Sequence, residues 1–111
     1  MILVVEDEPI PLMLAQDVLE EAGYDTMAVS TADEALALLE ARPDDIDIVF
    51  TDVRMPGSID GLELARIVCG RWPDKRVIIT SGHLSAAEAA PHCVRFVCKP
   101  WTTVDLLNVV I

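Results

Sequence analysis

The sequence is poor in basic residues. Only 8 of its 111 residues are Lys or Arg, against 19 Asp or Glu, so the formal net charge is −11 at pH 7. Proteins that bind nucleic acid need a surplus of Lys and Arg to displace the counterions of the phosphates. The composition therefore argues against direct nucleic-acid binding, and most of the acidic surplus is interpreted as a solvated surface.

Long hydrophobic runs are also missing. No apolar stretch approaches the roughly 20 residues that a helix needs to cross a bilayer, and residues Met1–Asp7 lack the basic segment of a signal peptide. With 52% hydrophobic residues, the chain is nevertheless apolar enough to form a core. We expect one cytoplasmic domain over residues 1–111 that does not bind membranes.

Cysteine and histidine are too few for a metal cluster or a disulfide framework. Cys69, Cys93 and Cys98 are odd in number and lack CxxC spacing, which argues against structural disulfides and against a zinc site. We interpret them as small buried hydrophobic residues. His83 and His92 have no His or Cys at ligand spacing, so neither is expected to bind a metal.

The chain does contain a regular alternation of short β-branched runs and helical patterns, without repeats or a linker. The predicted strands are Ile2–Val5, Met27–Val29, Ile46–Phe50, Val77–Ile79 and Val94–Cys98. The predicted helices are Leu12–Ala22, Ala32–Ala41, Leu62–Arg71, Ala86–Ala90 and Val104–Ile111. Strict alternation implies parallel strands joined by right-handed crossovers, and therefore a three-layer α/β sandwich.

Capping residues support the helix predictions. At four predicted helix starts, a side-chain oxygen precedes an acidic residue by three positions. The four pairs are Thr31 with Glu34, Asp60 with Glu63, Ser85 with Glu88, and Thr102 with Asp105. Gly23 and Gly70 stand where helices commonly end in a left-handed cap.

Polar side chains collect where the predicted strands end, which is the edge at which such folds bind their ligands. The residues there are Glu6, Asp7, Asp52, Thr80, Ser81 and Lys99. Neighbouring carboxylates disfavour one another's ionisation, so a site that keeps all three charged needs a cation. Oxygen ligands without His or Cys suit Mg²⁺, which keeps several waters and often binds a phosphate.

Four motifs at these strand ends resemble those of the receiver domain of two-component response regulators. They are Val4-Val5-Glu6-Asp7-Glu8-Pro9, Thr51-Asp52-Val53-Arg54-Met55-Pro56 followed by Asp60-Gly61, Ser81-Gly82, and Lys99-Pro100. Their order matches the family along essentially the whole chain. The resemblance implies a flavodoxin-like, doubly wound sheet of five parallel strands in the order 2-1-3-4-5, with five helices.

The resemblance also implies roles for the residues of the site. Asp52 corresponds to the phosphoacceptor, Lys99 to the lysine that pairs with the phosphoryl group, and Ser81 to the switch hydroxyl. Glu6 and Asp7 correspond to the acidic pair that, with the acceptor, binds Mg²⁺ or Mn²⁺. The family more often has Asp at the position of Glu6, so this longer side chain reaches the metal either directly or through water.

The resemblance also implies roles for Arg54, His83 and Phe96. The backbone carbonyl of Arg54 corresponds to a metal ligand, while its side chain and that of His83 lie where the family tunes the lifetime of the phosphoryl group. His83 is otherwise a solvated loop residue. Phe96 corresponds to the aromatic switch position and is otherwise a core residue. A shift of one residue in strand register would put Thr80 in the place of Ser81.

The implied function is signalling rather than enzymatic turnover. A sensor histidine kinase or a histidine phosphotransfer protein would donate the phosphoryl group in a Mg²⁺-dependent reaction. The added charge would move the loop after the fourth strand and change the surface of the fourth helix, fifth strand and fifth helix. The expected target is a downstream protein or a linked effector domain, and a homodimer is compatible with this scheme.

Three other functions fit the residues less well. A phosphatase of the haloacid dehalogenase type needs a general acid two residues after its nucleophile, where this chain has Arg54. A flavodoxin-type flavin carrier needs a phosphate-binding loop where this chain has Glu6-Asp7-Glu8. The remaining alternative is a pseudo-receiver that binds proteins without phosphorylation, and the intact set of Asp7, Asp52 and Lys99 argues against it.

Overall fold

The computed structural model of the chain describes residues 1–53, 57, 59–81, 93–99 and 101–110. These residues form five strands and four helices, in strict alternation up to β4. The elements are β1 (Ile2–Val5), α1 (Pro9–Glu21), β2 (Thr26–Val29), α2 (Ala32–Ala41), β3 (Ile48–Asp52), α3 (Gly61–Arg71), β4 (Arg76–Ser81), β5 (Val94–Cys98) and α4 (Thr103–Val110). The helix predicted over Ala86–Ala90, with its Ser85 cap, lies outside the described residues.

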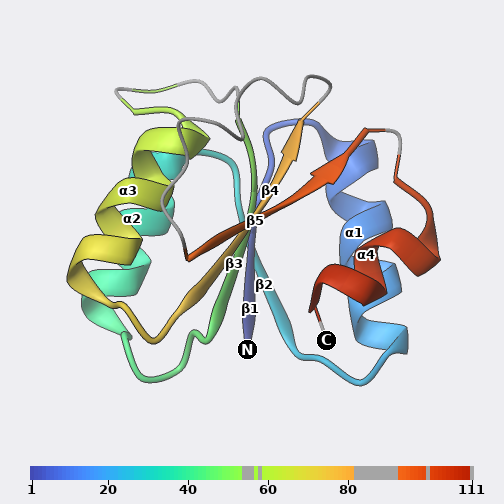
Figure 1. Ribbon diagram of the computed structural model, residues 1–111, viewed down its shortest axis with the longest axis horizontal. Helices are drawn as coiled ribbons and strands as arrows, with labels where there is room; N and C mark the ends of the chain where they lie inside the picture. Colours follow the sequence, from blue (N-terminus) through green and yellow to red (C-terminus); the bar gives the residue numbers. More distant parts are fainter. Residues whose placement is uncertain (54–56, 58, 82–92, 100, 111) are drawn as a thin grey trace.

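All five strands are parallel and lie in the order β2-β1-β3-β4-β5, which confirms the predicted fold. Figure 1 shows α2 and α3 on one face of the sheet and α1 and α4 on the other. Each face carries its own apolar core, because alternate residues of a strand point to opposite faces. None of the helices in the described part of the chain has the length and apolarity of a membrane span.

The third strand begins two residues later than its apolar run predicts. Ile46 is fully buried but precedes the strand, and the backbone N–H of Asp47 donates to the carbonyl of Met1 at 3.0 Å. Pairing with β1 then starts at Ile48 and continues to Thr51, and Asp52 pairs with β4 as the last residue of the strand. Ile46 is as deeply buried as the residues of β3, so an apolar pattern in the sequence does not show where the strand begins.

The predicted caps are observed at three helix starts, those of α2, α3 and α4. The backbone N–H groups of Glu34, Glu63 and Asp105 donate to the side chains of Thr31, Asp60 and Thr102 at 3.0, 2.8 and 3.1 Å. Gly23 has φ +98° and follows α1 in the left-handed conformation, as predicted.

The prediction that Gly70 caps a helix is wrong. This residue is helical, and α3 continues to Arg71. The N–H of Trp72 still donates to Val68 at 2.8 Å, and Pro73 then ends the helix because a proline has no N–H to donate.

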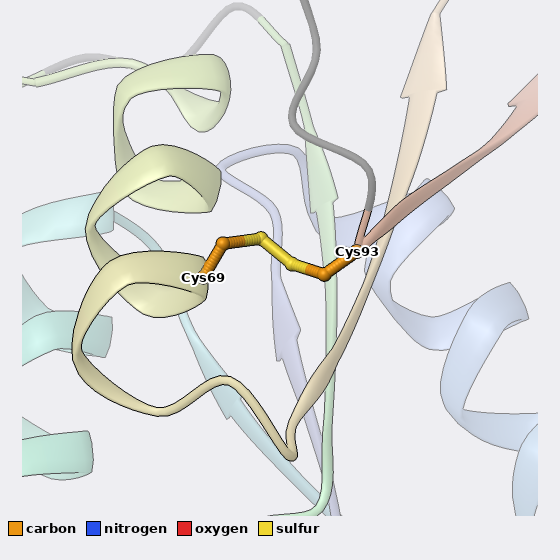
Figure 2. The surroundings of a disulfide bond; sticks show 2 residues. All are labelled: Cys69 and Cys93. Carbon is orange, nitrogen blue, oxygen red and sulfur yellow. A yellow bond between two sulfur atoms is a disulfide. The ribbon is translucent and has the colours of Figure 1, made fainter.

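The expectation of unpaired cysteines is also wrong for two of the three. Cys69 in α3 and Cys93 just before β5 form a disulfide with a Cα–Cα distance of 6.1 Å. Figure 2 shows this bond between the helix and the start of the strand. Both residues pack against the core on the α2 and α3 side, so the packing of these elements brings them together. A separation of 24 residues without CxxC spacing gave no sign of this pairing.

Candidate functional site

The sheet register places the predicted site residues at one edge. Val5 pairs with Thr51 in the neighbouring strand, so Glu6 and Asp52 leave β1 and β3 at the same level. Asp52 pairs in turn with Thr80 of β4. Because the strands are parallel, Lys99 after β5 lies at this carboxyl edge as well.

Lys99 and Asp52 meet directly across the sheet. The ammonium Nζ of Lys99 contacts the Oδ2 atom of Asp52 as both an ion pair and a hydrogen bond. The Asp52 side chain is 15% exposed and the Lys99 side chain 39%, so solvent and small molecules reach the pair from one side. Two residues separated by 47 positions in the chain therefore form one charged centre.

Glu6 is the buried carboxylate of this centre, with 6% of its surface exposed. Its Oε1 atom accepts a hydrogen bond from the N–H of Glu8 at 3.1 Å. Burial raises the pKa of Glu6, and the negative charges of Asp52 and Asp7 raise it further, against the opposing effects of the Glu8 N–H and of Lys99. Lys99 therefore does not fully offset the negative charge around Glu6.

The chemistry of these residues fits Mg²⁺. The candidate ligands offer only oxygen atoms, which a hard divalent cation prefers. The described residues contain no group of three His, Cys, Asp or Glu side chains able to hold a metal ion by themselves. A Mg²⁺ ion that keeps several waters and takes a backbone oxygen does not need such a group. Arg54, whose carbonyl is the predicted backbone ligand, lies outside the described residues.

The backbone of Asp52 is held by a glycine whose structural role the sequence did not reveal. Gly61, the first residue of α3, donates its N–H to the carbonyl of Val53 at 2.9 Å. A Cβ atom at Gly61 would overlap the carbonyl oxygen of Asp52. That same oxygen accepts the hydroxyl of Thr51 at 3.0 Å. Only a residue without a side chain allows α3 to begin this close to the strand.

The remaining predicted residues are placed only in part. Ser81 ends β4 opposite Cys98, while its side chain and the whole of His83 lie outside the description. Phe96 is half-buried and packs against the core on the α2 and α3 side. This placement agrees with the core interpretation of Phe96 and leaves its switch role untested.

The pKa of Glu6 predicts how stability changes with pH. Because its pKa is raised in the folded state, the folded chain holds this proton to higher pH than the unfolded chain. The free energy of unfolding therefore falls as pH rises from the ordinary glutamate pKa through the raised one. Glu6→Gln removes that fall and keeps an oxygen for the Glu8 N–H. We expect it to stabilise the protein at neutral pH, because a neutral amide is buried at a lower cost than a charged carboxylate. The gain should lie in the range of about 0.5–2 kcal/mol that single stabilising substitutions commonly give.

Urea denaturation at several pH values across this interval measures the effect. The matched control is Glu20→Gln on the exposed face of α1, which should change the free energy of unfolding by less than about 0.5 kcal/mol. If Glu6→Gln is less stable than the unmodified chain at neutral pH, the conclusion that the buried charge of Glu6 destabilises the folded chain is wrong.

Comparison with known proteins agrees with this geometry. The model of the response regulator receiver domain family matches residues 2–111. The chain is 40% identical over 105 residues to the nitrogen assimilation regulatory protein NtrX of Azorhizobium caulinodans. The aligned region covers 90% of this chain and 23% of that protein. The chain is also 38% identical over 111 residues to the C4-dicarboxylate transport transcriptional regulatory protein DctD of Rhizobium meliloti, covering 96% and 24% of the two chains. This chain thus spans about a quarter of the length of these two relatives.

Solved structures show the same fold. A response regulator receiver protein from Sinorhizobium medicae superposes with a TM-score of 0.89 at 32% identity, over 98% of this chain and 89% of that one. The receiver domain of NtrX from Brucella abortus gives a TM-score of 0.84 at 31% identity, over 99% and 94% of the two chains. The family match, these relatives and the sheet order lead to one conclusion: the chain belongs to the response regulator receiver domain family.

Proposed function

We propose that the chain is a phosphoacceptor that takes a phosphoryl group from a phosphohistidine onto Asp52. The observation that carries the proposal is the contact of the Lys99 ammonium with the Asp52 carboxylate. The buried carboxylate of Glu6 interacts electrostatically with both of these residues and with Asp7. A carboxylate nucleophile with a cation next to it, partly open to solvent, meets the main demands of phosphoryl transfer. Receiver domains are signalling domains, and this role agrees with the family.

The transfer exchanges one bond to phosphorus for another. A carboxylate oxygen of Asp52 forms the new P–O bond, and the electron pair of the breaking P–N bond returns to the donor imidazole. Lys99 neutralises charge on an equatorial phosphoryl oxygen, and the hydroxyl of Ser81 serves another. Asp7, Asp52, Glu6 and the carbonyl of Arg54 would hold Mg²⁺, which when bound neutralises phosphoryl charge and orients the donor.

The donor protein needs a place to dock next to Asp52, and α1 offers one. Three apolar side chains of this helix are exposed: Ile10 at 72%, Met13 at 60% and Leu14 at 54%. Leu14 also lines a hollow together with Lys99 and Trp101, so the apolar surface reaches the charged centre. We propose that a histidine kinase or a histidine phosphotransfer protein packs an apolar helical face here.

The output follows from the change of charge at Asp52. A bound phosphoryl group adds negative charge and draws Lys99, and Ser81 with it, into new positions. The predicted output surface includes β5 and α4, whereas the predicted helix between β4 and β5 falls outside the described residues. We propose that this surface acts on an effector domain or a separate protein, and that the protein works in the cytoplasm. DctD is described as a transcriptional regulatory protein, and the chain matches only about a quarter of it.

A phosphorylation time course with and without the metal tests the proposal. The protein is incubated with acetyl phosphate, first with Mg²⁺ and then with a chelator, and intact mass is measured. We expect the mass of one phosphoryl group to be gained with Mg²⁺ and nearly none with the chelator, because the site keeps excess negative charge without the cation. A chain that gains no mass under either condition would instead fit the pseudo-receiver alternative and end the proposal.

A further inference from the structure

Thr80 carries a buried hydroxyl on β4, and it pairs with Asp52 in the sheet. It is 2% exposed, and its Oγ1 atom has no hydrogen-bond partner among the residues that the structure describes. Buried hydroxyl groups are nearly always hydrogen-bonded, because leaving one unsatisfied costs free energy. A valine would fill the same volume on a strand without this cost. The resting structure therefore does not explain why residue 80 carries a hydroxyl group.

The strand register places Thr80 next to Asp52 on the neighbouring strand. Thr80 pairs with Asp52 on one side and with Val97 on the other. Residues paired across neighbouring parallel strands point to the same face of the sheet. Ile78, two residues earlier in β4, lies in the core on the α1 and α4 side, as does Val97. Thr80 therefore faces the same side as the Asp52 carboxylate.

Lys99 must cross the carboxyl end of β4 to reach Asp52. Its side chain starts after β5 and ends at a carboxylate on β3, and β4 lies between these strands. Two strand spacings amount to about 10 Å. The ion pair ends at Asp52, which is level with Thr80, and its Lys99 side chain starts two residues beyond Val97, the β5 partner of Thr80. The buried hydroxyl thus lies between the elements that supply the acceptor and the ammonium.

We propose that Thr80 is a positioning residue for Lys99. Its hydroxyl accepts a hydrogen bond from the Lys99 ammonium when that ammonium turns from the Asp52 carboxylate to an incoming phosphoryl group. An ammonium carries three N–H donors, and the carboxylate loses its charge once an oxygen is bonded to phosphorus. The Thr80 hydroxyl then accepts a hydrogen bond from the Lys99 ammonium and holds that ammonium next to the phosphoryl oxygens. This inference rests on the proposed phosphoacceptor function.

The first test compares Thr80→Val, which removes only the hydroxyl, with Thr80→Ser, which keeps it. Each protein is incubated with acetyl phosphate and saturating Mg²⁺, and the rate of mass gain is measured. We expect Thr80→Val to be slower by about tenfold, as for the loss of a hydrogen bond to a charged group. Thr80→Ser should stay within about twofold of the unmodified chain. A purely structural role for Thr80 gives the opposite ranking, because serine loses the buried methyl group and valine does not.

Urea denaturation of the unphosphorylated proteins separates folding from positioning. Thr80→Val should be as stable as the unmodified chain or more so, since no hydrogen bond is lost in the resting state. The matched control is Thr26→Val on β2, a hydroxyl that accepts from Gln16 at 3.1 Å far from Asp52 along the sheet. This control should leave the rate of mass gain unchanged.

A double-mutant cycle tests the route through Lys99. In a Lys99→Ala background, followed over longer incubations, Thr80→Val should change the rate by less than about twofold. An undiminished tenfold effect in that background would overturn the assignment to Lys99. Equal rates for Thr80→Val and the unmodified chain would overturn the inference and leave the phosphoacceptor function intact. An unmodified chain that gains no phosphoryl group would overturn both.

Discussion

Replacing Asp52 with Asn should abolish phosphoryl acceptance. The amide keeps the size of the side chain but lacks the anionic oxygen that attacks phosphorus, and it no longer balances the Lys99 charge. Loss of a nucleophile reduces rates by more than about a thousandfold in well-studied enzymes. With acetyl phosphate and Mg²⁺, intact mass spectrometry should therefore find no gain for Asp52→Asn on the time scale that labels the unmodified chain.

The control for this result is Asp17→Asn. Asp17 is an exposed aspartate of α1, so its replacement makes the same change of charge on the surface and leaves the carboxyl edge as it is. It should be labelled at the rate of the unmodified chain. Equal labelling of Asp52→Asn and Asp17→Asn would show that the acceptor lies elsewhere.

Replacing Gly61 with Ala should strongly destabilise the fold and disturb the acceptor. The new Cβ would overlap the carbonyl oxygen of Asp52 and approach the Thr51 hydroxyl at 3.1 Å. The obstructing atom belongs to the backbone of a central strand, so it cannot rotate out of the way. We expect a loss of about 3 kcal/mol or more in the free energy of unfolding, the upper end of overpacking effects. The rate of phosphoryl transfer should fall as well, because Asp52 must move.

Gly70 in the same helix provides the matched control. It is helical and exposed, and a Cβ there would meet no atom within 4 Å. Gly70→Ala should stabilise the protein by about 0.5–1 kcal/mol, because alanine loses less backbone entropy in a helix than glycine does. Urea denaturation of both variants measures the difference. A Gly61→Ala protein within about 1 kcal/mol of the unmodified chain would show that α3 can shift without cost.

The sequence alone predicts the architecture because its local signals agree with one another. The fully buried run Ile2–Val5 and the helix Ala32–Ala41 with its Thr31 cap were predicted with their observed bounds. The order of the strands came from the family resemblance, since hydrophobic periodicity carries no information about which strands are neighbours. Once the order is known, the meeting of Asp52 and Lys99 follows from parallel strands that end at one edge.

Features that depend on packing between elements were not predictable in this way. The sequence shows a Gly after Asp60, but only coordinates show that Gly61 lies against the carbonyl of Asp52. The sequence likewise offers Thr80 and Ser81 as alternatives. The register pairs Thr80 with Asp52, and the burial of Thr80 emerges only when both neighbouring strands are in place.

The disulfide of Cys69 and Cys93 makes a covalent ring out of the chain segment that contains the whole of β4. In the unfolded chain this ring removes many extended conformations. For a loop of this length the lost entropy corresponds to about 3.5 kcal/mol of stabilisation. The strand with Thr80 and Ser81 thus starts folding from a restricted set of states, tied to α3 at one end and to β5 at the other. The cytoplasm, where we propose that the protein works, keeps thiols reduced and would remove this contribution. The stability of the sheet therefore depends on the redox state around the protein.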